Sequence, residues 1–411
     1  MAFGLLGEKL GHSYSVKVHH ALGNQTYDLF ERKESELGEF LKTENLRGFN
    51  VTIPYKEKII AYLDGISEEA KAIGAVNTVV KKEGKWLGYN TDYYGFLYLL
   101  KRKKVAISPF HFLVLGDGAT SKTVCSALKA KGAGRVTVLS RKKPPFYQEV
   151  ADFYQDTDYI INTTSVGMYP HTDSSLISLS GFKRLKGVFD VIYNPLRTKL
   201  LLEAEARGLV YRDGLPMLIA QAFYADEIFF DHQNLEEKLE AIIGEIRREK
   251  ENIVLIGMPG VGKTTLGKAL AKALKRPFYD TDVLLREKLG ELSTYIQKEG
   301  EEKFRQEETE VLKTLGKETG MVIATGGGII TRMENFYHLR QNGRIYQLDK
   351  ALSYLATKNR PFSQGGFQSI RRLYDMRNRH YQAFRQVYVR HRTKEKTVRA
   401  ILEDFYENSS Y

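Results

Sequence analysis

Residues 257–264 read GMPGVGKT, and no other segment limits the possible folds of this chain as strongly. The loop follows the apolar run NIVLI (252–256) and precedes LGKALAKAL (266–274), whose apolar residues recur at helical spacing. In this setting a GxxxxGK[ST] loop joins a buried parallel strand to a helix and presents backbone N–H groups to phosphate. The sequence therefore predicts a P-loop domain with a parallel sheet that binds a nucleotide.

Backbone and side chains of this loop have different tasks. Glycines let the backbone curve around an anion, an ammonium group can reach the terminal phosphates, and a hydroxyl can coordinate Mg²⁺. We assign the ammonium group to Lys263 and the metal-coordinating hydroxyl to Thr264. The residues expected to hold the nucleotide are Gly260, Val261, Gly262, Lys263, Thr264 and Thr265.

A second glycine-rich turn, HFLVLGDGATSK (111–122), also lies between an apolar run and a helical run. In a dinucleotide-binding turn, Gly116 would permit the tight turn, Gly118 would let the backbone approach a pyrophosphate, and Ala119 would open the helix. Ser121 stands in place of the third glycine of the usual fingerprint. Taken alone, the motif is equally compatible with an ordinary strand-to-helix turn.

The next apolar run, RVTVLS (135–140), indicates which cofactor would bind there. An NAD enzyme places an acid about 20 residues after the first glycine to bind the ribose hydroxyls. This chain has Ser140, Arg141 and Lys142 instead. Because a carboxylate would repel a 2′-phosphate and a guanidinium can bind it bidentately, the sequence favours NADP(H). The alternative interpretation is a solvent-exposed basic turn.

Length and composition indicate a globular protein with two or three domains. The chain has 411 residues, of which 42% are hydrophobic and 27% charged, and its formal net charge is +12. The basic residues are scattered or lie inside the motifs above, so we expect small anionic ligands and no nucleic acid.

No apolar run approaches the roughly 20 residues that cross a bilayer. Cys125 is the single cysteine and the N-terminus lacks signal-peptide features, so we expect a cytoplasmic protein without membrane binding. The oligomeric state cannot be predicted.

Alternating strand and helix patterns predict an α/β chain with three parts. Residues 1–102 together with 218–240 are expected to form an α/β substrate-binding domain, in which 218–240 pack back on the first part. Residues 103–217 are expected to form a Rossmann-like NADP-binding domain. A charged helical segment runs into a predicted linker at 241–251, and residues 252–411 form the P-loop domain.

Over residues 3–240 the sequence resembles the shikimate dehydrogenase family. The matching segments follow the family's order and spacing: GHSYS (11–15), NVTIPYKE (50–57), GAVNTV (74–79), YNTDYYGF (89–96), INTTSVGM (161–168), FDVIYNP (189–195) and DGLPMLIAQA (213–222). The resemblance implies reduction of 3-dehydroshikimate to shikimate by NADPH. It also implies that Lys56 and Asp92 form the catalytic pair, in which a lysine held beside a carboxylate protonates the forming alkoxide. Taken singly, Lys56 could be a surface lysine and Asp92 a helix cap.

The same resemblance implies two sets of binding residues. The substrate would be bound by Ser13, Ser15, Thr52, Lys56, Asn77, Asp92, Tyr193 and Gln221. The cofactor would be bound, besides the glycine turn and the basic turn, by Asn162, Thr163, Gly214 and Met217.

Residues 252–407 resemble shikimate kinase. The matching segments are FYDTD (278–282), EGEEKFRQEE (299–308), ATGGGII (324–330), NRPF (359–362) and RNRHY (377–381). Each alone could be a charged helix or an ordinary loop. Together they imply that ATP phosphorylates the 3-hydroxyl of shikimate.

This resemblance also implies roles for individual residues. Asp280 would lie near Mg²⁺, and Asp282 would orient or deprotonate the attacking hydroxyl. Arg360, in a lid-like segment, would act with Lys263 on the transferring charge. The shikimate-binding residues would be Asp282, Arg305, Gly326, Gly327, Gly328 and Arg377, with the two guanidinium groups binding the ring carboxylate. Glu308 could hold Arg305 in place.

The two resemblances concern consecutive steps, since the first reaction forms the hydroxyl that the second phosphorylates. We therefore expect a bifunctional enzyme on the route to chorismate and aromatic amino acids. One alternative is a quinate-type dehydrogenase fused to another small-molecule kinase, and Arg141 argues against an NAD-preferring enzyme of that type. The other is a non-catalytic metabolite-sensing regulator, and the presence of Lys56, Asp92, Lys263 and Asp280 argues against it.

Overall fold

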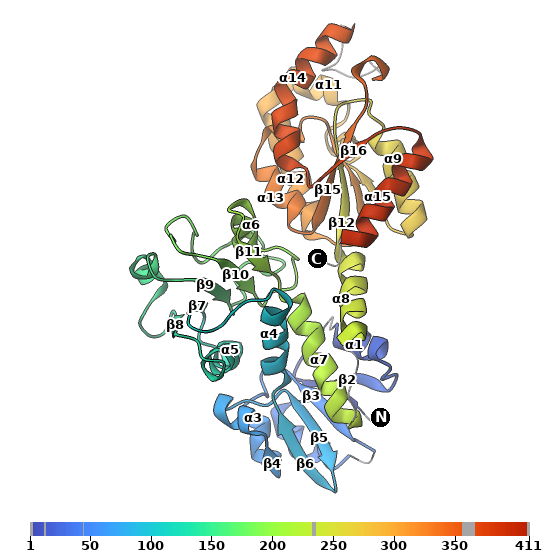
Figure 1. The fold of residues 1–411 in the computed structure, drawn as a ribbon. Helices are drawn as coiled ribbons and strands as arrows, with labels where there is room; N and C mark the ends of the chain where they lie inside the picture. Colours follow the sequence, from blue (N-terminus) through green and yellow to red (C-terminus); the bar gives the residue numbers. More distant parts are fainter. Residues whose placement is uncertain (1–2, 12–13, 44, 232–235, 356–365, 409–411) are drawn as a thin grey trace. The chain divides into compact units, whose positions relative to one another are not determined.

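The chain forms two compact units, and each is described by itself (Figure 1). The computed structural model describes residues 3–11, 14–43, 45–231, 236–355 and 366–408. The first unit consists of Met1–Met168, Asp173–Asn194 and Glu203–Ile243, and the second of Tyr169–Thr172, Pro195–Leu202 and Gly244–Tyr411. The division falls within helix α8, Glu236–Lys250, and the domain boundaries expected from the sequence stay predictions. In the described ranges, no helix is long and apolar enough to cross a bilayer.

The first unit opens with a mixed six-stranded sheet of order β2-β1-β3-β5-β6-β4. Strand β1 pairs in parallel with β2 and β3, whereas β5 is antiparallel to β3 and β6. The strands are β1 Phe3–Gly7, β2 Tyr27–Glu31, β3 Gly48–Val51, β4 Gly65–Ile66, β5 Thr78–Lys82 and β6 Lys85–Tyr89. The connecting helices are α1 Ser15–Leu22, α2 Leu37–Phe40 and α3 Glu68–Ile73.

The second sheet of this unit is parallel throughout, in the order β11-β10-β9-β7-β8. Because β7 lies between β8 and β9, the chain leaves β7 toward both edges of the sheet, and a ligand crevice is expected at the carboxyl ends of β7 and β9. The strands are β7 His111–Leu115, β8 Arg135–Leu139, β9 Tyr159–Asn162, β10 Gly187–Asp190 and β11 Val210–Arg212. Helices α5 Ala119–Ala130 and α6 Lys199–Ala206 follow β7 and β10.

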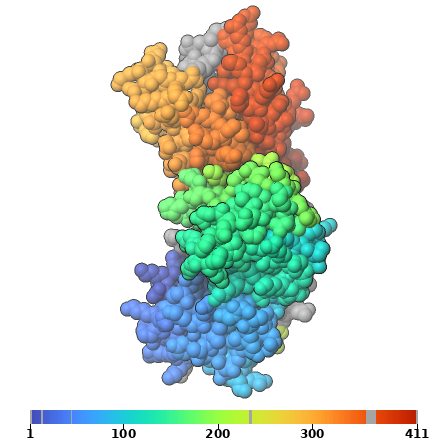
Figure 2. Space-filling view, turned by 90° about the vertical axis from the view of Figure 1, so that its left-hand side faces the viewer, coloured from blue at the N-terminus to red at the C-terminus, as the bar shows by residue number. Residues whose placement is uncertain are grey.

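Two helices lie side by side between these sheets, α4 (Thr91–Arg102) and α7 (Leu215–Phe230) (Figure 1). Helix α7 has apolar residues on almost every side, as a helix buried between two layers requires. It contacts α4, α1 and β5, so the segment expected to pack back on the first 102 residues does so along α7. In Figure 2 the blue residues around the first sheet and the green residues around the second form two adjoining lobes of this unit.

The second unit contains a five-stranded sheet of order β13-β14-β12-β15-β16, which is parallel throughout. Helices α9 and α15 cover one face of this sheet, and α12, α13 and α14 cover the other (Figure 1). The strands are β12 Asn252–Ile256, β13 Phe278–Asp280, β14 Val322–Ala324, β15 Gly343–Asp349 and β16 Val387–Arg390. The helices are α9 Lys263–Leu274, α10 Thr281–Leu289, α11 Leu292–Glu299, α12 Glu301–Lys317, α13 Glu334–Arg340, α14 Gly366–Phe384 and α15 Lys394–Asn408.

Strand β12, the predicted strand before the P-loop, is central and fully buried, which explains its uninterrupted apolar sequence. The three sheets confirm the predicted α/β fold class: an α/β substrate-binding part, a Rossmann-like part and a P-loop part with a parallel sheet.

Candidate active sites

The predicted catalytic pair of the first unit is in contact. Lys56 Nζ lies 2.6 Å from Asp92 Oδ2, and the two side chains are only 20% and 14% exposed. Lys56 follows β3, and its backbone oxygen accepts a hydrogen bond from Val76 N. Asp92 is the second residue of α4, whose N-cap is Asn90. The capping role that Asp92 could have played is therefore taken by Asn90, and the Asp92 carboxylate faces the lysine.

Two amides predicted to bind substrate lie near the start of α4. The Asn77 side chain is buried, and its Oδ1 accepts a hydrogen bond from Thr91 N at 2.6 Å. Asn77 Nδ2 donates to Gln221 Oε1 at 3.4 Å, which links the first sheet to α7. The residue after Thr91 is Asp92, so Asn77, Gln221 and the predicted catalytic pair converge at one end of α4.

A glycine that the sequence reasoning did not select makes this convergence possible. A Cβ added at Gly95 would lie 2.8 Å from Met217 O and 3.1 Å from Gln221 N. The absence of a side chain at Gly95 therefore lets α7 approach α4 closely. This approach brings Met217 and Gln221 of α7 close to the start of α4. The available signal was a glycine inside a helical pattern, where alanine would be more favourable by about 1 kcal/mol.

The structure describes three of the remaining predicted substrate residues, namely Ser15, Thr52 and Tyr193. The Tyr193 ring meets the Tyr14 ring edge-on at 6.0 Å, and burial raises the pKa of Tyr193. Ser15 opens α1, and Thr52 directly follows β3. The contact of Tyr14 with Tyr193 was not predicted, because nothing in HSYS distinguishes the Tyr14 ring from that of a surface tyrosine. Ser13 lies outside the described residues.

The two loops at the carboxyl ends of β7 and β9 are in contact at the expected crevice. Gly116 has φ +105°, and an added Cβ would lie 2.9 Å from Thr163 Oγ1 and 2.8 Å from Thr164 Cγ2. Thr163 Oγ1 donates to Leu115 O at 2.7 Å. Gly118 is the N-cap of α5, and no atom would lie within 4 Å of a Cβ there. The turn thus presents the start of α5, at Ala119, to open space.

Several predicted cofactor residues have partners inside the protein. Asn162 is buried, and its amide binds Asp190 Oδ1 at 3.1 Å and Thr164 Oγ1 at 2.7 Å. A Cβ at Gly214 would lie 2.0 Å from Val191 O, so backbone packing already requires glycine there. These contacts shape the loops of the crevice. Met217 is likewise a core residue, and the cofactor contacts of all three residues stay predictions.

The basic turn after β8 combines a structural serine with exposed charges. Ser140 is fully buried, and its Oγ accepts a hydrogen bond from Lys142 N at 2.9 Å. The side chains of Arg141 and Lys142 are exposed. Ser140 therefore fixes the turn, and the two cations can be reached by an anionic ligand.

The nucleotide loop of the second unit has the backbone that the motif requires. Gly260 and Gly262 have φ of +85° and +102°, and Gly262 is the N-cap of α9. Lys263 is buried and donates to the backbone oxygens of Gly257 and Met258 at 2.8 and 3.1 Å. The Lys263 ammonium thus binds backbone oxygens of the same loop that is expected to bind phosphate. Val261 is buried in the loop, and Thr265 is exposed on α9.

The predicted metal-binding oxygens meet beside this loop. Thr264 Oγ1 donates to Asp280 Oδ2 at 2.6 Å. The other oxygen of Asp280 accepts a hydrogen bond from Asp282 N at 3.0 Å and caps α10. A hydroxyl and a carboxylate next to a phosphate cradle suit Mg²⁺, which prefers oxygen ligands.

The predicted acceptor residues surround the triglycine loop, Gly326–Gly327–Gly328. A Cβ at Gly326 would lie 2.7 Å from Asp282 Oδ1, one at Gly328 would lie 2.0 Å from Arg305 Nη1, and one at Gly327 would lie 3.4 Å from Arg377 Nη1. A larger residue at Gly326 or Gly328 would therefore collide with Asp282 or Arg305. At Gly327 the nearest atom belongs to Pro259, at 3.1 Å, and Arg377 lies at ordinary contact distance.

Arg305 is buried and held by two carboxylates of its own helix. Its Nη2 lies 2.8 Å from Glu301, and its Nη1 pairs with the buried Glu308. Arg377 Nη1 donates to Gly327 O at 3.0 Å. Both guanidinium groups are therefore fixed in orientation. Arg360, predicted to act over the phosphates, lies outside the described residues.

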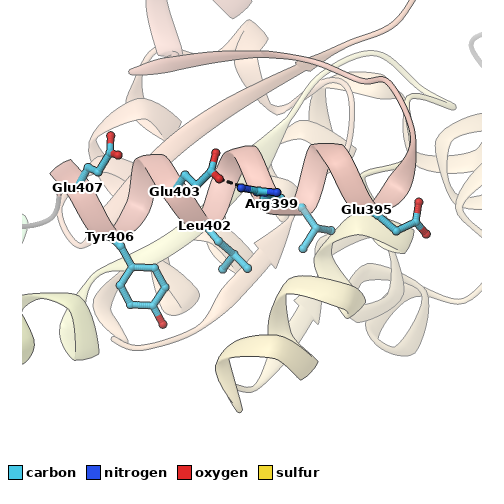
Figure 3. Close-up of a pocket in the computed structure, with 7 residues that line it drawn as sticks. Glu395, Arg399, Leu402, Glu403, Tyr406 and Glu407 are labelled. Atoms are coloured by element: carbon cyan, nitrogen blue, oxygen red, sulfur yellow. Dashed lines mark hydrogen bonds and ion pairs between the residues drawn. The ribbon is translucent and has the colours of Figure 1, made fainter.

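A hollow along α15 contains none of these residues (Figure 3). Its polar contact is the exposed ion pair of Arg399 with Glu403. We assign no role to it. The lining residues are Glu395, Val398, Arg399, Leu402, Glu403, Tyr406 and Glu407.

Both halves of the chain are similar to known proteins. Residues 5–79 match the model of the shikimate dehydrogenase substrate binding domain, and residues 259–407 match the shikimate kinase model. The NADP(+) shikimate dehydrogenase of Clostridium perfringens strain SM101 is 44% identical over 247 residues, which are 55% of this chain and 91% of that protein.

Solved structures of shikimate dehydrogenases are similar to part of the chain. Shikimate dehydrogenase 1 from Peptoclostridium difficile has a TM-score of 0.54 at 36% identity, covering 60% of this chain and 98% of that chain. The shikimate 5-dehydrogenase of Thermus thermophilus, solved with NADP(H) and shikimate, has a TM-score of 0.54 at 31% identity, covering 60% and 99%. The chain therefore belongs to the shikimate dehydrogenase family and carries, after its dehydrogenase part, a shikimate kinase domain.

Proposed function

We propose that this chain reduces 3-dehydroshikimate to shikimate with NADPH and then phosphorylates the 3-hydroxyl of shikimate with MgATP. The observation that carries the proposal is the presence, in one chain, of the Lys56–Asp92 pair and of an Asp282–Arg305–Arg377 group around the triglycine loop. Each arrangement suits a hydroxylated, carboxylated ring. The proposed location is the cytoplasm, which a chain with a single cysteine suits.

In the dehydrogenase reaction a hydride adds to the carbonyl carbon of the substrate. The carbonyl oxygen then needs a proton to become a hydroxyl. Bound NADPH supplies the hydride. The Lys56 ammonium donates the proton and stabilises the negative charge that develops on the oxygen. Asp92, whose Oδ2 lies 2.6 Å from the Lys56 ammonium, holds the lysine in place. Asn77 and Gln221 orient ring hydroxyls beside this pair.

Specificity for NADPH is assigned to Arg141. Replacing Arg141 by alanine is expected to raise the KM for NADPH roughly tenfold or more, because a charge-assisted hydrogen bond to the 2′-phosphate is lost. The KM for NADH should not change. Steady-state kinetics with both cofactors measure this difference. Lys129→Ala, which removes another exposed cation near the same sheet, is the control, and equal effects of the two changes would refute the assignment.

The kinase reaction requires the acceptor hydroxyl to lose a proton as phosphoryl transfer proceeds. Arg305 and Arg377 bind the ring carboxylate, and Asp282 accepts the proton of the 3-hydroxyl. Lys263 stabilises charge on the transferring phosphoryl group, for which it must leave the two backbone oxygens it now contacts. Thr264 and Asp280 would hold Mg²⁺, which neutralises phosphate charge.

The two half-reactions test this proposal separately. Purified chain with 3-dehydroshikimate and NADPH should oxidise NADPH without ATP. The same chain with shikimate and ATP should form shikimate 3-phosphate in Mg²⁺ buffer and lose this activity in excess EDTA. Since the dehydrogenase mechanism uses no metal, EDTA should leave NADPH oxidation unchanged. Turnover of quinate in preference to shikimate, or loss of both activities with EDTA, would contradict the proposal.

A further inference from the structure

Two buried side chains outside the proposed ligand-binding set fix the triglycine loop. Thr281 Oγ1 accepts a hydrogen bond from Gly326 N at 2.8 Å. Tyr381 Oη donates a hydrogen bond to Gly327 O at 3.0 Å. Both residues are 1% exposed. They hold the loop at consecutive residues, one through a backbone N–H and the other through a backbone oxygen.

The loop needs such support because three consecutive glycines have more backbone freedom than any other tripeptide. It must also stay in one place, since Gly326 lies against the Asp282 carboxylate and Gly328 against the Arg305 guanidinium. A small shift of the loop would change where these side chains meet the acceptor. Errors of about 1 Å in such groups can lower a rate about a hundredfold.

Thr281 supports the side of the loop that faces Asp282. It lies between the proposed metal ligand Asp280 and Asp282, and it is the first residue of α10. Without its hydroxyl, the buried Gly326 N–H would lose its hydrogen-bond partner. Gly326 would then be free to move relative to the Asp282 carboxylate, which orients the reacting hydroxyl.

Tyr381 supports the side of the loop that faces Arg377. It follows Arg377 by one helical turn on α14, and both side chains donate to the oxygen of Gly327. Burial raises the pKa of Tyr381 to about 12, so its hydroxyl stays a donor at neutral pH. With Tyr381 bound to the Gly327 oxygen, the carbonyl does not depend on Arg377 alone, and the guanidinium, held through Nη1, can offer its other N–H groups to a carboxylate.

We propose that Thr281 and Tyr381 are positioning residues of the kinase reaction, which hold the triglycine loop in register with Asp282 and Arg377. This inference rests on the proposed shikimate kinase function. It assigns the two residues different effects. Thr281 controls the orientation of the reacting hydroxyl and therefore kcat, whereas Tyr381 controls carboxylate binding and therefore the KM for shikimate.

Isosteric variants of the full chain test the two roles. Thr281→Val should lower kcat roughly tenfold while the KM for shikimate changes less than about twofold, and Thr281→Ser should restore kcat. Tyr381→Phe should raise the KM for shikimate roughly tenfold with a smaller change in kcat. NADPH-dependent reduction by the same chain should be unchanged and measures the amount of chain in each assay.

Tyr346→Phe is the matched control for a structural effect. Tyr346 is another fully buried tyrosine of this unit, and its hydroxyl donates to Asp404 at 2.8 Å, outside the site. Its kinase constants should match those of the unmodified chain. Unchanged constants in Thr281→Val and Tyr381→Phe, or equal effects in all three variants, would overturn the inference. Failure of the unmodified chain to phosphorylate shikimate would instead refute the proposed function on which it rests.

Discussion

Replacing Lys56 with methionine is expected to lower the rate of 3-dehydroshikimate reduction by a factor between about a hundred and ten thousand. Methionine keeps the length and apolar stem of lysine but removes the charge and the proton. Hydride transfer would then leave an alkoxide without a donor, and Asp92 would lose the partner at 2.6 Å. NADPH absorbance with saturating substrate measures the loss. Shikimate phosphorylation by the same variant should be unchanged.

Lys58→Met is the matched control for this change. Lys58 lies two residues further along the chain, is exposed, and pairs with Glu34 on the surface. The control should reduce 3-dehydroshikimate at the rate of the unmodified chain, since an exposed ion pair contributes little to stability. A Lys56→Met chain with more than about a tenth of normal activity would show that another group supplies the proton.

Replacing Lys263 with methionine should impair the kinase activity and leave the dehydrogenase activity intact. Phosphorylation of shikimate is expected to fall at least about a hundredfold, because a positive charge aimed at the transferring phosphoryl group is lost. Lys263 is buried and contacts two backbone oxygens of the loop, so its charge lies at the nucleotide loop and not on the protein surface. Reduction of 3-dehydroshikimate should remain normal, and ADP release measures the kinase defect.

A lysine on the same helix provides the comparison. Lys268 is exposed on α9, little more than one turn after Lys263. Lys268→Met should phosphorylate shikimate normally. If Lys263→Met also reduced dehydrogenase activity, the change would have acted through folding, and the assignment of Lys263 to phosphoryl transfer would lose its support.

The parts of the sites that follow local rules could be predicted from the sequence. The P-loop is a contiguous motif, and its glycines have the positive φ values that the motif requires. Arg305 and Glu308 are three residues apart on a helix, which places their side chains together. The parallel order of the second and third sheets likewise follows from alternating strands and helices.

The parts that depend on contacts between distant residues could not be predicted. Gly95 matters because Met217 O, more than a hundred residues away, approaches it. Tyr381 binds the oxygen of Gly327, and Thr281 binds the amide of Gly326. In each case one partner is a backbone group. Every residue has the same backbone groups, so the sequence does not indicate which of them makes the contact. Asn162 likewise has an internal contact that its motif did not indicate, since its amide binds Asp190 Oδ1; its cofactor contact stays a prediction.

In the proposed function the chain first reduces and then phosphorylates the same ring. The most direct test of this order compares the amount of phosphorylated product with the amount of NADPH oxidised. The intact chain is incubated with 3-dehydroshikimate, NADPH, ATP and Mg²⁺, and phosphorylated product is followed by phosphorus NMR while NADPH is followed by absorbance. We expect one shikimate 3-phosphate for each NADPH oxidised, with no phosphorylated product when NADPH is omitted. NADPH oxidation that never leads to shikimate 3-phosphate, or phosphorylation of 3-dehydroshikimate itself, would contradict this account.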